Sequence, residues 1–155
     1  MRVPEDMRFF RQMTTGKVVV MGRETFESFP GKQPLKDRVN IVLSKNGSFD
    51  DDRLIICRSL DELFRELKKY PPDDIFVIGG ESVYTQLLPY CAEVYVTRFE
   101  KVFKADRHFP DMDRMDGWKL VSESAPCLYQ DMSFRFLKYV KSADAIGQYR
   151  YSEQT

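Results

Sequence analysis

The sequence contains a single histidine and only three cysteines among its 155 residues. Structural zinc sites need four closely spaced Cys or His ligands, whereas Cys57, Cys91 and Cys127 are far apart in the chain. An odd number of widely spaced cysteines does not build a disulfide framework either. These absences argue against a fold held by metal or disulfides, and we expect buried free thiols in a cytoplasmic protein.

The sequence also lacks an excess of either charge sign. Lysine plus arginine and aspartate plus glutamate number 24 each, so no basic surplus favours nucleic acid or an anionic membrane as a partner. No apolar run approaches the length of a transmembrane helix, and no signal peptide opens the chain. Hydrophobic residues make up 43% of the chain, enough for one globular domain with a substantial core. We therefore expect a soluble intracellular protein.

Two strand-like apolar runs end in glycine and lead into helical patterns. One ends at Gly22, before a helix that begins with Arg23, and the other ends at Gly79-Gly80. At such turns glycine lets a ligand approach the backbone closely, and the free N–H groups of the helix start can hold a phosphate. The same turn also occurs in proteins where it has only a structural role. Arg23 can bind a phosphate or be a solvated surface residue. The pattern leaves both interpretations open.

The chain opens with a predicted helix, Pro4–Met13, in which Met7 and Phe10 fall on a buried face at helical spacing. Asp6 lies next to that face and has two interpretations. It can be an ordinary acidic residue in a first turn, stabilised by the helix dipole. Alternatively, it can be a partly desolvated carboxylate in a ligand pocket.

The other patterns predict strands and helices in alternation, followed by antiparallel strands. Strands that are apolar on both faces are typical of a parallel sheet covered by helices. Ser59 and Glu62 form a capping box at the start of a further helix. The order of elements indicates an α/β fold, a three-layer sandwich with a central mixed, mostly parallel sheet flanked by helices. The predicted strands are 17–21, 39–43, 54–57, 75–78, 93–99, 118–122 and 133–140, and residues 142–155 are predicted to form a polar tail.

Ligands of open α/β sheets bind at the carboxyl ends of the strands. Ser44 and Lys45 follow a strand, where they can bind a phosphate or begin a turn. His108 falls in a loop, where a lone histidine is more often a packed or surface residue than a catalyst. The residues expected to gather at the carboxyl ends are Asp6, Arg23, Ser44, Gly79, Gly80 and Thr97.

Five blocks of the sequence, taken in order, resemble the dihydrofolate reductase family. They are Val3–Phe10, Val20–Ser28, Leu35–Leu43, Val77–Tyr84 and His108–Pro110, the last before Trp118. The resemblance covers roughly residues 2–140, and we place the reductase-like domain at residues 1–141. It implies NADPH-dependent reduction of 7,8-dihydrofolate to tetrahydrofolate, by hydride transfer to C6 and protonation of N5. We expect a monomer unless a second chain supplies a missing strand.

The resemblance also implies roles for the substrate-binding residues. Asp6 matches the acidic residue that hydrogen-bonds the pterin, and Thr97 matches the threonine bonded to that carboxylate. N5 lies beyond the direct reach of Asp6 in the family, so water is expected to deliver the proton. Arg38 matches the arginine that pairs with the glutamate α-carboxylate in a bidentate geometry, which lysine does not reproduce. The other matches on the substrate side are Met7, Phe10, Phe29, Leu35, Ile78 and Tyr84.

A second set of residues matches the NADPH-binding positions of the family. Lys45 stands where it can help Ser44 hold the 2′-phosphate that distinguishes NADPH from NADH. Glu81 departs from the family, which more often has a small residue beside the pyrophosphate. A carboxylate that faced the phosphates would be unfavourable, but a side chain in the first turn of a helix can turn outward. The full cofactor set is Gly22, Arg23, Glu24, Thr25, Ser44, Lys45, Gly79, Gly80, Glu81, Ser82 and Val83.

A larger departure lies at the start of the chain. Family members usually carry an interior first strand and a loop over the nicotinamide before the block that begins at Val3, and neither is seen here. Loss of an interior strand unpairs backbone groups on both neighbours, at about 1–3 kcal/mol for each buried group. Three explanations are open: a start at an internal methionine of a longer protein, which we favour; a poorly folding truncation; or another element, such as the tail or a second subunit, in the empty position. Nothing in residues 141–155 resembles the missing strand, so we do not expect a circular permutation.

Two other functions compete with this hypothesis. One is the related reductase of riboflavin synthesis, which shares the fold. The block around Asp6 and Arg38 argue against it, because in the family that the chain resembles both bind folate. A non-catalytic remnant that binds nucleotide weakly is favoured by the missing strand. The intact set of Asp6, Arg23, Arg38 and Thr97 argues against that remnant.

Overall fold

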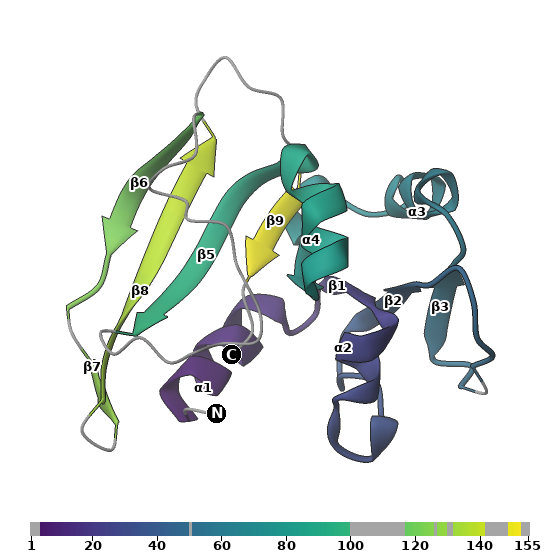
Figure 1. Ribbon diagram of the computed structural model, residues 1–155, viewed down its shortest axis with the longest axis horizontal. Helices are drawn as coiled ribbons and strands as arrows, with labels where there is room; N and C mark the ends of the chain where they lie inside the picture. Colours follow the sequence, from purple (N-terminus) through teal and green to yellow (C-terminus); the bar gives the residue numbers. More distant parts are fainter. Residues whose placement is uncertain are drawn as a thin grey trace.

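Over the residues that the computed structural model describes, nine strands form one sheet at the centre of the molecule (Figure 1). The structure describes residues 4–49, 51–99, 117–125, 127–129, 132–141 and 149–152. The strand order is β3-β2-β1-β4-β9-β5-β8-β6, with β7 paired to β8. The strands are β1 (Val18–Gly22), β2 (Val39–Leu43), β3 (Leu54–Cys57), β4 (Ile75–Gly79), β5 (Cys91–Phe99), β6 (Trp118–Glu123), β7 (Cys127–Tyr129), β8 (Met132–Lys141) and β9 (Tyr149–Ser152).

Strands β1 to β4 form the parallel half of the sheet. Every residue of β1 and of β4 is buried, because helices cover both faces of these strands. Val18 and Val20 point into one core cluster, whereas Val19 and Met21 point into the other. The predicted α/β architecture with a mostly parallel sheet is confirmed.

The helices divide between the two faces of the sheet (Figure 1). Leu63 of α3 (Leu60–Leu67) and Val83 of α4 (Glu81–Leu87) belong to one core cluster, and Phe10 of α1 (Pro4–Thr14) and Phe26 of α2 (Arg23–Glu27) belong to the other. The Ser59 side chain accepts a 3.1 Å hydrogen bond from the Glu62 backbone N–H, as the capping box predicts. The helices are α1 (Pro4–Thr14), α2 (Arg23–Glu27), α3 (Leu60–Leu67) and α4 (Glu81–Leu87), with short 3-10 turns η1 (Pro30–Lys32), η2 (Pro72–Asp74) and η3 (Leu88–Tyr90).

Strands β5, β8 and β6 form the antiparallel part of the sheet. The predicted strands at 93–99, 118–122 and 133–140 are confirmed, each with slightly different ends. Strand β7 was not predicted, because three residues give no measurable alternation and its Leu128 is 75% exposed. It pairs with the first part of β8 and so extends the hairpin that joins β6 to β8.

The short strand β9 lies inside the sheet, parallel to both β4 and β5. The prediction of a polar tail over residues 142–155 is therefore wrong for residues 149–152. The sequence Tyr-Arg-Tyr-Ser contains two aromatic residues that suit a strand, but four residues with polar ones among them give no recognisable strand pattern. In this structure β9 occupies the position between β4 and β5, and the three explanations for the start of the chain stay predictions. The domain limit at residue 141 stays a prediction.

Two of the cysteines are buried free thiols, as expected. Burial raises the pKa of Cys57 to about 11 and that of Cys91 to about 12, so both stay protonated at neutral pH. Cys127 is partly exposed on β7. In the described part of the chain, no helix has the length and apolar character needed to cross a membrane.

Candidate functional site

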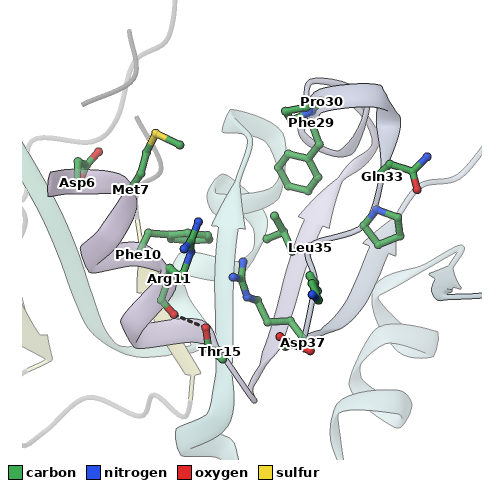
Figure 2. A pocket seen from close by; sticks show the side chains of 13 residues that line it. Asp6, Met7, Phe10, Arg11, Thr15, Phe29, Pro30, Gln33, Leu35 and Asp37 are labelled. Carbon is green, nitrogen blue, oxygen red and sulfur yellow. Dashed lines mark hydrogen bonds between the residues drawn. The ribbon is translucent and has the colours of Figure 1, made fainter. Parts of the chain in front are cut away.

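A cavity of about 600 Å³ opens between helix α1 and the loop that follows α2 (Figure 2). In Figure 2 the side chains of Met7 and Phe10 on the helix lie across the cavity from those of Phe29 and Leu35 on the loop. The cavity thus combines an apolar middle with polar groups at its borders, which is the usual composition of a small-molecule site. The lining residues are Asp6, Met7, Phe10, Arg11, Thr15, Phe29, Pro30, Gln33, Pro34, Leu35, Lys36, Asp37 and Arg38.

Asp6 is the buried carboxylate of this cavity, with 5% of its surface exposed. It lies in the first turn of α1, four residues before the buried Phe10, so both side chains sit on the same face of the helix. Of the two sequence interpretations, the structure supports the desolvated carboxylate in a pocket. Met7, on the next position, lines the cavity but is 43% exposed, so the prediction that it lies on a buried face of the helix is wrong.

Arg38 brings a cation to the same cavity from the start of β2. Its guanidinium lies 5.9 Å from the centre of the Phe10 ring, and its Nε–H is buried without a hydrogen-bond partner. Burial, followed by the nearby Arg11 guanidinium, lowers the pKa of Arg38, while Asp37 opposes the shift. An arginine remains charged under such conditions, so the cavity offers a carboxylate ligand a cation with an unsatisfied donor.

Asn40 fixes the loop that carries Arg38, and sequence reasoning missed it. Its side chain accepts a 2.9 Å hydrogen bond from the Leu35 N–H and donates to the Leu35 and Arg38 carbonyls at 2.9 and 3.0 Å. Asn40 is only 2% exposed, so these bonds are made away from water. An asparagine inside the apolar run of β2 was the signal that could have identified it.

The two glycine turns meet at the carboxyl ends of neighbouring strands. Strands β1 and β4 pair in parallel, with Met21 opposite Gly79, so Gly22 lies beside the second turn. A Cβ on Gly79 or Gly80 would lie 3.5 or 3.4 Å from the Thr25 hydroxyl. Helices α2 and α4 have five and seven residues, so their dipoles are small, and the turn offers a ligand mainly close backbone approach.

Basic side chains gather around the turn that follows β2. Arg58 donates to the Ser44 carbonyl at 3.2 Å and to the Gly47 carbonyl at 2.9 Å. The Arg23 guanidinium approaches Gly47 so closely that a Cβ there would lie 3.1 Å from its Nη1. Arg23 also donates to Glu27 at 2.5 Å, and Lys45 is exposed on the same turn. Arg58 was not among the predicted residues, because it follows a strand outside every block of resemblance.

Other predicted residues lie outside the cavity lining. Ile78 is buried in the core cluster that also contains Phe10. Tyr84 belongs to the cluster on the opposite face of the sheet, with its ring edge near Gly79. Thr97 lies in β5 opposite Phe136 of β8, and His108 falls outside the described residues.

The first turn of α4 carries three residues of the predicted cofactor set. Glu81 and Ser82 are exposed, in keeping with an outward-turned Glu81, whereas Val83 is buried against Gly22. Glu24, in the first turn of α2, is exposed as well. Over the described ranges, no group of His, Cys, Asp and Glu could hold a metal ion.

Comparison with known proteins gives a consistent result. A family model described as dihydrofolate reductase matches residues 1–141. The chain is 38% identical over 120 residues to a dihydrofolate reductase of Bacillus subtilis (strain 168), which covers 77% of this chain and 68% of that protein. It is 34% identical over 148 residues to one of Enterococcus faecium, covering 94% of this chain and 87% of the relative.

A solved structure has the same fold. The dihydrofolate reductase from Enterococcus faecalis, complexed with NADP(H) and RAB-propyl, superposes with a TM-score of 0.78. The match has 29% sequence identity and covers 92% of this chain and 84% of the other. The family model extends over most of the chain, and the site lies on the elements that it matches. The chain therefore belongs to the dihydrofolate reductase family.

Proposed function

We propose that this protein reduces 7,8-dihydrofolate to tetrahydrofolate with NADPH. The observation that carries the proposal is the cavity between α1 and the loop before β2, which has the buried carboxylate of Asp6 and the half-buried cation of Arg38 on its border. A folate has hydrogen-bond donors on its pterin, an aromatic middle and carboxylates on its glutamate. This order of groups complements the order of residues in the cavity.

At the pterin end, Asp6 would accept hydrogen bonds from the 2-amino group and N3. A buried carboxylate with these partners orients the ring and favours its protonated form, because charge is poorly screened away from water. Water would deliver the proton to N5. Thr97 is proposed to bond the Asp6 carboxylate and so fix its orientation.

At the other end, Arg38 would pair with the α-carboxylate of the glutamate. The planar guanidinium makes two parallel hydrogen bonds to a carboxylate, and its buried Nε–H gains a partner. Met7, Phe10, Phe29 and Leu35 provide the apolar walls between the two charged ends. Ile78 and Tyr84 are proposed to border the ring near the nicotinamide.

The residues around the two glycine turns fit a dinucleotide. NADPH, when bound, supplies the hydride that C6 of the substrate receives. Gly79 and Gly80 would let a pyrophosphate approach the backbone closely, and Gly22 would complete the turn, packed against Val83. Arg23, Ser44, Lys45 and Arg58 surround the turn after β2, where a 2′-phosphate would find several cationic donors. Glu24, Glu81 and Ser82 are proposed to line the outer edge of this site.

The direct test is oxidation of NADPH by the purified 155-residue chain in the presence of dihydrofolate. We expect turnover that requires both compounds, yields tetrahydrofolate by mass spectrometry and is much slower with NADH. Deuterium carried on the transferring position of NADPH should appear in the product. NADPH oxidation that does not depend on dihydrofolate, or product without deuterium, would refute the proposed reaction.

A further inference from the structure

Strand β9 is the backbone link between two sets of strands in the described sheet. One set, β3-β2-β1-β4, carries the glycine turns, and the other contains β5, β8 and β6. Strand β9 pairs with Phe76 and Val77 of β4 on one side and with residues of β5, from Cys91 to Tyr95, on the other. In Figure 1 it lies between β5 and helix α4.

Helix α1, which carries Asp6, spans this junction on one face of the sheet. Phe9 packs against the second set of strands. Its ring centre lies 6.3 Å from that of Tyr95 in β5 and 4.5 Å from that of Phe136 in β8. The next residue, Phe10, belongs to the core cluster that contains Phe76 of β4, in the first set of strands. The position of Asp6 relative to the glycine turns therefore depends on how far apart the two sets of strands are held.

A core cluster bridges the same junction on the other face. It joins Val20 and Val77 of the first set to Val94 and Leu137 of the second, together with Val83 of α4. Helices α1 and α4, which border the proposed ligands, therefore both pack in contacts that join the two sets of strands across β9. Neighbouring strands lie about 4.8 Å apart, so β9 holds β4 and β5 at a separation of about 9.6 Å.

We propose that β9 is a positioning element for the reductase site, supplied by the C-terminal part of the chain. This inference rests on the proposed function, because it concerns the alignment of substrate and cofactor in that reaction. If β9 left its place, β4 and β5 could close by one strand spacing, about 4.8 Å, and α1 would shift relative to the glycine turns. Hydride transfer is far more sensitive than this, since a misplacement of about 1 Å can cost on the order of 100-fold in rate.

The first experiment measures amide hydrogen exchange of the full chain, together with its molecular mass in solution, which gives the oligomeric state. We expect a monomer in which amides 149–152 exchange at least about 100-fold more slowly than in a free peptide of that sequence. Amides of β4 and β5 that face β9 should be protected as well. Exchange at the free-peptide rate, or a dimer whose strand comes from the partner copy, would overturn the proposal.

The second experiment compares Tyr151→Pro with Tyr151→Phe. Proline removes the N–H that the ladder needs, whereas phenylalanine keeps it. We expect kcat with dihydrofolate to fall at least about 100-fold in the proline variant and to stay within about threefold in the control. NADPH binding, whose proposed residues lie on the first set of strands and on the segments next to them, should change less than about threefold in both.

Comparing turnover and NADPH binding in the two variants distinguishes a positioning role of β9 from a general loss of stability. The unmodified chain tests the proposed function separately. Equal turnover of the two variants would overturn the role of β9, and so would equal losses of NADPH binding and turnover. If the proline variant does not fold, the exchange rates of the unmodified chain decide. If the unmodified chain has no reductase activity, the proposed function fails, whatever the exchange data show for the strand.

Discussion

Gly22 of β1 and Val83 of α4 are in such close contact that a Cβ on Gly22 would lie 2.9 Å from the Val83 Cγ2. Both residues are buried, and valine has little rotamer freedom to move aside in a helix. Gly22→Ala is therefore expected to destabilise the protein by roughly 1–3 kcal/mol through overpacking. Because α4 would be pushed from the glycine turns, NADPH affinity should fall too.

A double-mutant cycle tests this contact. Val83→Ala removes the clashing methyl groups, so the double variant should recover much of the stability and NADPH affinity lost in Gly22→Ala. Chemical denaturation and NADPH fluorescence titration measure the two quantities. Strictly additive effects would show that the 2.9 Å contact is not the cause.

Arg38→Lys tests the carboxylate partner of the cavity. Lysine keeps the charge but loses the bidentate geometry and the buried Nε donor. The KM for dihydrofolate should rise roughly 10- to 100-fold, as expected for hydrogen bonds to a charged group worth about 1.5–3 kcal/mol. A pterin substrate without glutamate should be used equally well by both proteins. Arg8→Lys, at an exposed position of helix α1, is the matched control.

Asn40→Ala tests whether the buried amide positions Arg38. Its removal leaves the Leu35 N–H and two carbonyls without these partners, at a cost of about 1–3 kcal/mol. We expect a lower unfolding midpoint together with a higher KM for dihydrofolate, whereas NADPH affinity should be nearly unchanged. The exposed Asn46 gives the control variant Asn46→Ala. A KM that stays at its original value would mean that Arg38 is held by other contacts.

Arg58→Ala tests the cationic cluster around the turn after β2. Loss of this guanidinium should weaken NADPH binding about 10-fold and leave NADH binding nearly unchanged, because only NADPH has the 2′-phosphate. The difference between the two cofactors should shrink at high salt, where exposed charges are screened. Lys68→Ala, at an exposed lysine after α3, controls for net charge. A parallel loss of NADPH and NADH binding would contradict a specific 2′-phosphate role.

Sequence patterns were sufficient for the elements whose periodicity is strong. The buried strands β1 and β4 are apolar on both faces, and the capping box at Ser59 marks the start of α3. Pattern alone did not settle the environment of Asp6, because burial depends on the distant loop that closes the cavity. The resemblance to the family identified the residue, and the fold explains its burial.

Other features depend on contacts that a linear pattern does not contain. Asn40 matters through three hydrogen bonds to a preceding loop, and Arg58 matters because β3 returns it to the turn after β2. Strand β9 has only four residues, and its place between β4 and β5 follows from pairing with strands more than fifty residues away in sequence. Short or polar segments of this kind gain their structure from tertiary pairing, which propensity does not register.

The most direct measurement is the rate of hydride transfer in the Asp6→Asn variant. The control is Glu5→Gln, because Glu5 lies beside Asp6 in the same helical turn. Asparagine keeps the shape of the side chain and removes the charge, so turnover of dihydrofolate should fall about 100- to 10,000-fold. NADPH affinity should stay within a few-fold, and Glu5→Gln should turn over like the unmodified protein. An Asp6→Asn protein with unchanged turnover, or a Glu5→Gln protein equally impaired, would contradict the role of the buried carboxylate.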